Sequence, residues 1–416
     1  MNKYLTNVGK NASKALDIKI NSKLKNKVLN KFAKLINKNK YKIINENKKD
    51  IKFSIKKGLK KNLIDRLVLN EVKIDQIIKS IITIAKLRDP IDVTLSQWRR
   101  PNGLIIKRVT IPIGVIGVIY ESRPNVTSDI SSLCFKSGNS VILRGGSEAY
   151  FSNQIIANLF RKALKENKIN ENYVQFIKNR NRKIVDLLLS KMEKFIDIII
   201  PRGGKNLVKK VQNISKVPII GHLEGNCHTY IDKDAKLNLA KKIVYNAKLR
   251  NTSICGATET ILFHKKSLKN FVNPVLMELQ KNDCLIIADN KIKKIFKGKS
   301  KKATRKDWAK EYLSPIVSVK SVKDVKDAVN HINKYGTMHT DAIITQNKKT
   351  AKFFLKNVKS SIAILNSSTQ FADGGEFGFG GEVGISTNKL PPRGPVGLNQ
   401  LVSYKYEIIG SGQIRK

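Results

Sequence analysis

One short segment, NTSICGATET at residues 251–260, surrounds a cysteine with small and hydroxyl-bearing residues. A cysteine acts as a nucleophile through its thiolate, which is favoured in an exposed, electropositive or helix-terminal setting. Cys255 suits that description, because Lys248 and Arg250 precede it and a predicted strand follows it. A cysteine that only packs is expected within an apolar run, as Cys134 is in ISSLCF. The sequence therefore favours Cys255 as the nucleophile.

The two remaining cysteines fit this role less well. Cys284, in DCLIIAD, lies in an apolar run that predicts the core of a strand. Cys227 adjoins His228 in GNCHTYID, which raises the alternative of a Cys-His dyad, but adjacent residues of a strand point to opposite faces. The four cysteines have no CxxC spacing, so we expect neither a bound metal nor a disulfide framework, and a reducing cytoplasm.

Two glycine pairs occur where a predicted strand runs into a predicted helix, in ILRGG and in IIIPRGG. Neither matches the G-x-G-x-x-G dinucleotide motif. Each nevertheless places an arginine and exposed backbone N–H groups at a helix N-terminus, a setting that favours a phosphate. An ordinary tight turn is the alternative for either loop, and two such loops in adjacent units favour a nucleotide.

The elements that position these residues follow from periodicity. Apolar residues recur every three or four positions from residue 1 to about 90, which predicts amphipathic helices with breaks at Gly58 and at 88–90. LIIKRVTIPIG predicts a β-ribbon, and GVIGVIY predicts a buried parallel strand. Strands, glycine loops and helices then alternate as far as the strand predicted at VPII (217–220), a pattern typical of an open parallel sheet with a cofactor at its carboxyl edge.

A second α/β series begins after residue 225. Its predicted strands are TILFH, CLIIAD, PIVSVK, DAIIT and SIAIL, with helices between them. FADGGEFGFGGEVGIS (371–386) predicts a glycine-rich loop, and the tail ends in alternating β-like sequence. The fold class is therefore α/β, with two Rossmann-like α/β domains and a small β extension.

The composition bounds the function classes. A chain of 416 residues with 41% hydrophobic residues suits a globular protein of two or three domains. The amino terminus has no apolar signal-peptide core and the apolar runs are too short to span a bilayer, so we expect a soluble cytoplasmic protein without a membrane partner. The net charge of +48 raises the alternative of a nucleic-acid-binding protein. Lysine recurs with Asn and Ile along the whole chain, and aromatic residues do not interleave with it, which favours a solvated surface without a specific nucleic-acid partner.

Five long motifs, in order, resemble the glutamate-5-semialdehyde dehydrogenases, also called gamma-glutamyl phosphate reductases, of the aldehyde dehydrogenase superfamily. The resemblance runs from about residue 60 to the end, and the first 50 or so residues fit only as a helical N-terminus. The motifs are IPIGVIGVIYESRPNVTSDISSLCFKSGNSVILRGGSEA (111–149), DIIIPRGG (197–204), GNCHTYID (225–232), NAK…C (246–255) and DGGEFGFGGEVGIST…RGPVGL (373–398).

The resemblance implies roles for individual residues. Cys255 falls at the superfamily's nucleophile, and Asn125 falls where a side-chain amide stabilises the oxyanion. Arg123 and Arg393 are candidates for binding the anionic substrate. The residues implied to bind the cofactor are Arg144, Gly145 and Gly146 at the adenosine ribose or its 2′-phosphate, Pro201, Arg202, Gly203 and Gly204 at the phosphates, and Glu311 at the nicotinamide ribose.

The chain departs from the family pattern at several positions. NAKLRNT replaces NAKTQRP before the cysteine, which shifts the arginine by one position. His222 stands where hydrolytic relatives carry a glutamate base and Glu224 lies two residues later, so we expect that base to be absent. A reductase of an acyl phosphate must keep its thioester from water, which agrees with that absence. Gln370 stands where Arg is expected, and Glu376 where Gln is expected.

The resemblance also implies a domain plan. It assigns residues 1–99 and 121–225 to an NADP-binding α/β domain, 226–384 to a catalytic α/β domain that carries Cys255, and 100–120 with 385–416 to a β-ribbon that forms homo-oligomers.

The implied activity is the NADPH-dependent reduction of L-glutamyl 5-phosphate, the second step of proline biosynthesis, with functional coupling to a glutamate 5-kinase. The alternatives are an acylating or hydrolytic aldehyde dehydrogenase with another small substrate, and a basic RNA-binding protein.

Overall fold

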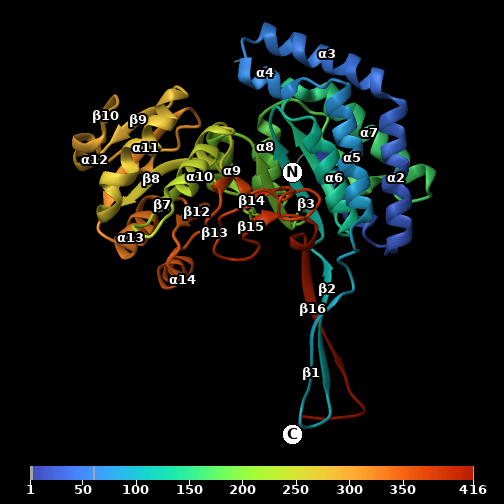
Figure 1. Cartoon of the computed structure of the whole chain (residues 1–416). Coiled ribbons are helices and arrows are strands. Elements are labelled where there is room, and N and C mark those ends of the chain that lie inside the picture. Colours follow the sequence, from blue (N-terminus) through green and yellow to red (C-terminus); the bar gives the residue numbers. More distant parts are fainter. Residues whose placement is uncertain (1–2, 60, 416) are drawn as a thin grey trace. The chain divides into compact units, whose positions relative to one another are not determined.

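A computed structural model describes residues 3–59 and 61–415; residues 1, 2, 60 and 416, which fall in the predicted NADP-binding domain and β extension, lie outside the described residues. The chain divides into two compact units. The first, here called the N-terminal unit, comprises Met1–Gly221, Gly378–Gly384 and Val396–Lys416. The second, the Cys255 unit, comprises His222–Phe377 and Ile385–Pro395. Figure 1 shows the helices and strands of each.

A four-stranded parallel sheet forms the centre of the N-terminal unit. Its strand order is β5-β4-β3-β6, formed by β3 (Val115–Tyr120), β4 (Ser140–Gly145), β5 (Val174–Phe176) and β6 (Ile198–Arg202). All six residues of β3 are buried. Alternate residues serve opposite faces, since Ile116 and Val118 join one core cluster while Val115 and Ile119 join another. The sheet therefore has a hydrophobic layer on each side, as the continuous apolar run GVIGVIY predicts.

Helices supply both of those layers. One cluster takes its helical residues mainly from α2, α3, α5, α6 and α7, and the other from α1, α8 and α9 (Figure 1). None of the described helices is long and apolar enough to cross a membrane. The bounds are α1 (Lys3–Ala15), α2 (Ser22–Lys38), α3 (Lys40–Lys56), α4 (Lys61–Leu67), α5 (Glu71–Lys86), α6 (Asn125–Lys136), α7 (Tyr150–Glu166), α8 (Lys183–Lys191) and α9 (Lys205–Ile214).

The helices predicted before residue 90 are confirmed, and so are their breaks. Gly58 follows α3 with a φ of 68°, a left-handed conformation that favours glycine and ends the helix. Helix α5 ends at Lys86, just before the RDP segment. The strand predicted at VPII is wrong, because only one isolated bridge, Ile199 to Ile219, forms there.

An antiparallel ribbon of three strands projects from the N-terminal unit (Figure 1). It consists of β1 (Thr94–Arg99), β2 (Ile105–Pro112) and β16 (Val402–Ile409), with β2 in the middle. The range predicted for the ribbon, 100–120, needs correction, since its last six residues are β3 of the parallel sheet. The physical reason is burial: β3 is covered on both faces, whereas most side chains of β16 are exposed.

The Cys255 unit has a seven-stranded parallel sheet of order β10-β9-β11-β8-β7-β12-β13. The five strands predicted after residue 225 are confirmed as β8, β9, β11, β12 and β13. One hydrophobic cluster includes residues of α10, α11 and α12, and another includes residues of α13 and α14. The bounds of the strands are β7 (Cys227–Ile231), β8 (Thr258–His264), β9 (Leu285–Ala288), β10 (Ser300–Lys302), β11 (Ile316–Val322), β12 (Thr340–Ile344) and β13 (Ile362–Leu365). The helices are α10 (Leu237–Leu249), α11 (Leu268–Lys281), α12 (Asn290–Ile295), α13 (Val325–Tyr335) and α14 (Lys348–Asn357).

The topology of this sheet brings three loops to one edge. Strands β8, β7 and β12 are neighbours, with Cys227 opposite Thr258 and His228 opposite Asp341. Because the strands are parallel, the segments that enter them meet at the amino edge of the sheet. Those segments carry Cys255, Gly225 and His339. Two short strands, β14 (Gly384–Ser386) and β15 (Gly394–Val396), pair with each other.

Candidate active site

Cys255 lies in the loop between α10 and β8 and is half-buried against Ile362, Ala372 and Ile385. The other three cysteines of the chain are buried free thiols. Burial raises the pKa of each of those thiols, to about 12 for Cys284. Cys255 is therefore the thiol in the setting that a nucleophile needs.

The backbone of Cys255 packs directly on Gly225. A Cβ atom at position 225 would lie 2.7 Å from Cα and from the carbonyl carbon of Cys255, and closer still to the carbonyl oxygen. Only glycine permits this approach of two backbone segments. The Gly225 N–H donates to Oε1 of Glu311 at 2.8 Å, which holds the glycine in place. Glu311 is predicted to contact a cofactor ribose. In the structure its carboxylate binds the backbone of Gly225, the glycine that packs against Cys255.

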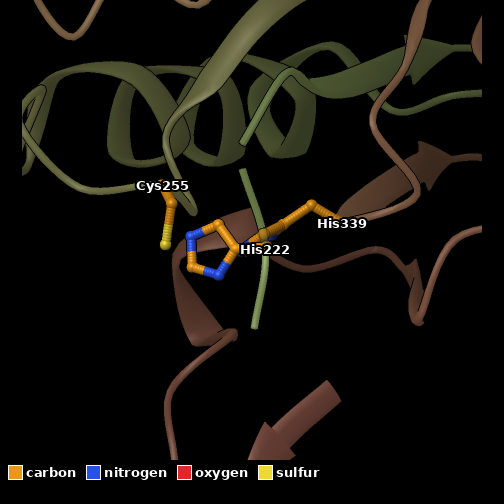
Figure 2. Close-up of side chains that lie close together, drawn as sticks. All are labelled: His222, Cys255 and His339. Atoms are coloured by element: carbon orange, nitrogen blue, oxygen red, sulfur yellow. The ribbon is translucent and has the colours of Figure 1, made fainter. Parts of the chain in front are cut away.

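Two imidazoles lie beside the thiol. One nitrogen from each of His222 and His339 and the sulfur of Cys255 lie within 4.8 Å of one another, and we call these three residues the Cys-His cluster (Figure 2). The two rings meet edge to face with centroids 4.9 Å apart. Nδ1 of His222 donates to the carbonyl oxygen of Ile385 at 2.8 Å. The residue that replaces the hydrolytic glutamate therefore contributes its ring to the neighbourhood of Cys255.

Cys227 and His228 do not form a dyad, as the alternation of strand residues predicts. The Cys227 thiol donates to the carbonyl oxygen of Cys255 at 3.1 Å and lies 3.5 Å from Nδ1 of His339. His228 Nδ1 and N each lie within 3 Å of Oδ1 of Asp341. Cys227 thus supports the backbone of the nucleophile loop, and His228 belongs to a separate buried network.

A buried ion pair brackets the nucleophile loop. Lys248, near the end of α10, donates from Nζ to Oε2 of Glu259 in β8 at 2.5 Å, and both side chains are fully buried. Burial raises the pKa of Glu259 to about 7, against the opposing effect of Lys248. The pair ties together the two elements that the loop connects, so it limits how far Cys255 can move.

Two positions that depart from the family pattern contact each other. Arg250 donates from Nε to Oε1 of Gln370 at 2.8 Å. The amide nitrogen of Gln370 in turn donates to the carbonyl oxygens of Ala247, at 2.9 Å, and Asn251, at 3.3 Å. The altered arginine and the altered glutamine therefore act as one unit that closes the end of α10. The third departure, Glu376, is exposed.

The first Arg-Gly-Gly loop, residues 144–146, makes contacts with other parts of the same unit. Arg144 is buried and donates to the carbonyl oxygens of Gly145, at 2.7 Å, and Arg180, at 3.3 Å. Side chains at Gly145 and Gly146 would collide with Asn153 and with the carboxylate of Glu148.

The helix that follows this loop does not offer the free N-terminus that the sequence pattern predicts. The backbone N–H groups of Phe151 and Ser152, in the first turn of α7, donate to the carboxylate of Asp50 at 3.1 and 2.8 Å. Asp50, from α3, also accepts from the Ser152 hydroxyl at 2.7 Å. An internal carboxylate thus occupies these two donors, and phosphate binding at the first loop stays a prediction.

The second glycine loop is better suited to an anion. Gly204 is the N-cap residue of α9 and has no side chain of its own to cap the helix. A Cβ at Gly203 would lie 2.7 Å from a methyl carbon of Leu207, so the close turn requires glycine. Pro201 is buried in β6, and Arg202 lies 3.9 Å from a carboxylate oxygen of Glu382. The Gly204 N–H donates to Glu121 at 3.0 Å, a contact that a phosphate would have to replace.

The side chains of the remaining predicted catalytic and substrate-binding residues are exposed or half-buried. Asn125 is exposed at the start of α6, and its amide donates to Asp129 at 3.2 Å. Burial raises the pKa of the Asp129 carboxyl, and the hydrogen bonds from Ser80 and Asn125 oppose that shift. Arg123 is half-buried just before α6. Arg393 is exposed and donates to the carbonyl oxygen of Lys359 at 2.7 Å.

A half-buried cysteine at the amino edge of one α/β unit, a second α/β unit with a glycine loop, and a projecting ribbon are the features of an aldehyde dehydrogenase-like protein. The sequence matches the aldehyde dehydrogenase family over residues 7–284 and 299–400, and the chain belongs to this family.

Relatives narrow the class. The gamma-glutamyl phosphate reductase of Bartonella quintana is 44% identical over 396 residues, 95% of this chain and 96% of that protein. The enzyme of the same name from Thermoanaerobacter sp. (strain X514) is 47% identical over 392 residues, 94% of each. The chain is thus a member of the gamma-glutamyl phosphate reductase group and an oxidoreductase.

Solved structures agree. The gamma-glutamyl phosphate reductase of Thermotoga maritima superposes with a TM-score of 0.96 at 39% identity, over 99% of this chain and all of that chain. An acetylating aldehyde dehydrogenase from Geobacillus thermoglucosidasius shares the fold, with a TM-score of 0.69 at 16% identity over 100% and 98% of the two chains. The predicted aldehyde dehydrogenase-like α/β fold is confirmed.

Sequence reasoning missed two residues at Cys255. His339, in GTMHTDA, belongs to no recognisable sequence motif, because it lies between turn residues and a predicted strand. Cys227 was considered only with its neighbour His228. Both residues could have been found from their positions in the sequence. His339 precedes β12 and Cys227 begins β7, and the amino ends of these strands lie at the same edge of the sheet as the Cys255 loop.

Proposed function

We propose that the chain reduces L-glutamyl 5-phosphate to L-glutamate 5-semialdehyde and phosphate with NADPH, the second step of proline biosynthesis. The observation that carries the proposal is the 44–47% identity to gamma-glutamyl phosphate reductases over almost the whole chain. The half-buried Cys255, held from behind by Gly225, supplies the matching chemical group.

The proposed first step uses only Cys255. Its thiolate forms a bond to the acyl carbon, the carbon–oxygen bond to phosphate breaks, and phosphate leaves with the electron pair. Phosphate is a good leaving group that needs little help from an acid. The product is a thioester on Cys255. The resemblance assigns stabilisation of the oxyanion to the Asn125 amide, in the manner of other preorganised donors.

The second step returns the thiolate. When bound, the nicotinamide cofactor supplies the hydride that reduces the thioester carbon. The tetrahedral alkoxide on Cys255 then collapses to the aldehyde: the carbon–oxygen double bond re-forms, the carbon–sulfur bond breaks, and the sulfur leaves as thiolate with no net proton transfer. The resemblance implies that the glutamate base of hydrolytic relatives is absent from this position, where the chain has His222.

The residues of the N-terminal unit fit a phosphate-bearing cofactor to different degrees. The loop from Pro201 to Gly204 fits better, because the dipole of α9 favours negative charge at this end and a phosphate would replace the carboxylate of Glu121 at the Gly204 N–H. Arg144 fits less directly, since both of its terminal nitrogens are bound to backbone carbonyls. Its buried Nε lacks a partner among the described residues. The preference for NADPH over NADH therefore rests on the resemblance, and comparing kcat/KM for the two cofactors tests it.

The decisive assay runs the reaction in reverse. Wild-type protein with glutamate 5-semialdehyde should reduce NADP⁺ only when inorganic phosphate is present, and Cys255→Ala should lose this activity. Activity that is indifferent to phosphate would identify an acylating or hydrolytic aldehyde dehydrogenase instead. Binding of RNA that survives in Cys255→Ala and falls steeply with salt, without any turnover, would favour the basic RNA-binding alternative.

The ribbon is the proposed oligomerisation element. Trp98, Tyr404 and Tyr406 are 40%, 49% and 54% exposed, and the ring centroids of Trp98 and Tyr406 lie 6.1 Å apart. Exposed aromatic side chains that gather on one element are typical of a surface that another chain covers. We propose that a second copy pairs through it. Light scattering should show an oligomer for wild type and a smaller species for Trp98→Glu.

A further inference from the structure

We propose that the Cys-His cluster is a binding site for a thiophilic divalent cation, with Zn²⁺ as the representative, and that the cation reversibly blocks the nucleophile. The metal site stands on the geometry of His222, Cys255 and His339. The inhibition by metal rests on the function proposed above for Cys255. The two claims are therefore tested separately.

The three candidate ligand atoms are already close to coordination distance. They lie within 4.8 Å of one another, and they come from three different segments of the Cys255 unit (Figure 2). A tetrahedral zinc with Zn–S of about 2.3 Å and Zn–N of about 2.0–2.1 Å separates its ligand atoms by roughly 3.4–3.6 Å. The ligand atoms must approach one another by at most about 1.4 Å, which rotation of the side chains supplies without a change of fold.

His339 offers a nitrogen that the protein leaves unused. The side chain is fully buried, and its Nε2 has no hydrogen-bond partner within residues 3–59 and 61–415. Its Nδ1 lies 2.9 Å from the Thr340 hydroxyl and 3.5 Å from the Cys227 sulfur. A buried polar nitrogen without a hydrogen-bond partner destabilises the folded state, and a bound cation would supply the missing partner. The contacts at Nδ1 leave Nε2 as the ligand atom.

His222 has the supporting contact that metal-binding histidines usually have. A carbonyl oxygen only accepts hydrogen bonds, so Nδ1 of His222 carries the proton in its 2.8 Å contact with Ile385. In the neutral ring that proton places the lone pair on Nε2. A second-shell backbone carbonyl that fixes the tautomer and the ring orientation is a general feature of histidine ligands. The edge-to-face contact with His339 further restricts the ring.

The donor set selects the class of cation. One thiolate and two imidazoles suit Zn²⁺, whereas Mg²⁺ and Ca²⁺ prefer oxygen ligands. On binding, the Cys255 thiol loses its proton to solvent and the sulfur forms a bond to the metal, with no change of oxidation state. Three protein ligands leave a fourth position for water. The sulfur lone pair that would attack an acyl carbon is then held by the metal.

Cobalt provides a direct spectroscopic test. Chelator-treated protein with Co²⁺ alone should give a thiolate-to-cobalt charge-transfer band that saturates at one metal per chain, and Zn²⁺ should displace it. Zn²⁺ should also protect Cys255 from iodoacetamide, and a chelator should restore alkylation. Excess Mg²⁺ should do neither.

Variants separate this site from adventitious binding. Cys255→Ser should abolish the band, and His339→Ala should weaken Zn²⁺ binding by at least 10-fold. His222→Ala, whose ring is half-buried, gives the same test if His339→Ala fails to fold. His264→Gln is the matched control, because it removes a histidine of the same unit outside the cluster, and it should bind as wild type does.

The outcomes distinguish the two claims. Equal metal binding by wild type, Cys255→Ser and both histidine variants would overturn the site, and so would the absence of a band in wild type. A cobalt band without phosphate-dependent turnover would support the metal site and contradict the proposed reductase function. Full turnover in the presence of saturating Zn²⁺ would overturn the inhibition.

Discussion

Gly225→Ala tests the support behind the nucleophile. The added Cβ would lie 2.7 Å from two backbone carbons of Cys255, whereas ordinary contacts begin at 3.4 Å. The even closer approach to the carbonyl oxygen means that the Cys255 backbone must withdraw by about 1 Å. Neither side can relieve the collision by a rotamer change, because both are backbone. The Glu311 contact to the Gly225 N–H keeps residue 225 from moving instead.

The expected result is a folded protein with poor turnover. A displacement of about 1 Å of a reacting group costs on the order of 100-fold in rate, or about 2.7 kcal/mol of transition-state stabilisation. The assay is kcat for phosphate-dependent NADP⁺ reduction, accompanied by circular dichroism and the rate of Cys255 alkylation.

The matched control is Gly221→Ala. Its Cβ would meet the ring of Pro201 at 3.4 Å, which is an ordinary contact, so kcat should stay within about 2-fold of wild type. A Gly225→Ala protein with wild-type kcat and an unchanged alkylation rate would refute the argument that the glycine contact positions Cys255.

Three further predictions concern titration, capping and thiol reactivity. Burial holds the pKa of His331 at about 2 against an ordinary 6.5, so its contribution to stability is complete above pH 6.5 and is lost as the pH falls. Urea unfolding at pH 7 and 5.5 should therefore show about 1.2 kcal/mol less acid destabilisation in His331→Gln than in wild type, and equal losses would contradict the assignment. Asp50→Ala leaves the donors of Phe151 and Ser152 without their cap and should lower the free energy of unfolding by about 3 kcal/mol, with a smaller loss in Asp50→Asn, which keeps an acceptor. Substoichiometric iodoacetamide should label Cys255 ahead of the three buried thiols, as peptide mass spectrometry can check, and preferential labelling elsewhere would remove it as the accessible nucleophile.

Much of the fold was predictable because it depends on local periodicity. GVIGVIY has no polar residue on either face, which only a strand covered on both sides tolerates, and β3 is such a strand. Apolar residues before residue 90 recur with a helical period, and helices α1 to α5 form there. VPII forms only one isolated bridge, at Ile219, although four-residue apolar segments elsewhere form strands β9 and β13.

Local sequence was a weaker guide to the helix ends. ILRGG and IIIPRGG look alike, and each precedes a helix. The sequence around the first loop does not reveal that Asp50, about a hundred residues earlier, caps the helix that follows it. At the second loop the Gly204 N–H likewise donates to a distant carboxylate, that of Glu121. Which backbone donors remain for a phosphate thus depends on long-range contacts.

By itself, the sequence determined the α/β class and the family, since these follow from composition, periodicity and long motifs, and it predicts Cys255 as the nucleophile. Only the tertiary structure decided what surrounds the thiol. Residues 222, 255 and 339 are far apart along the chain and meet because parallel strands β7, β8 and β12 align their amino ends. The same alignment presses Gly225 onto Cys255. Such contacts depend on the pairing of non-adjacent strands, which no local window of sequence specifies.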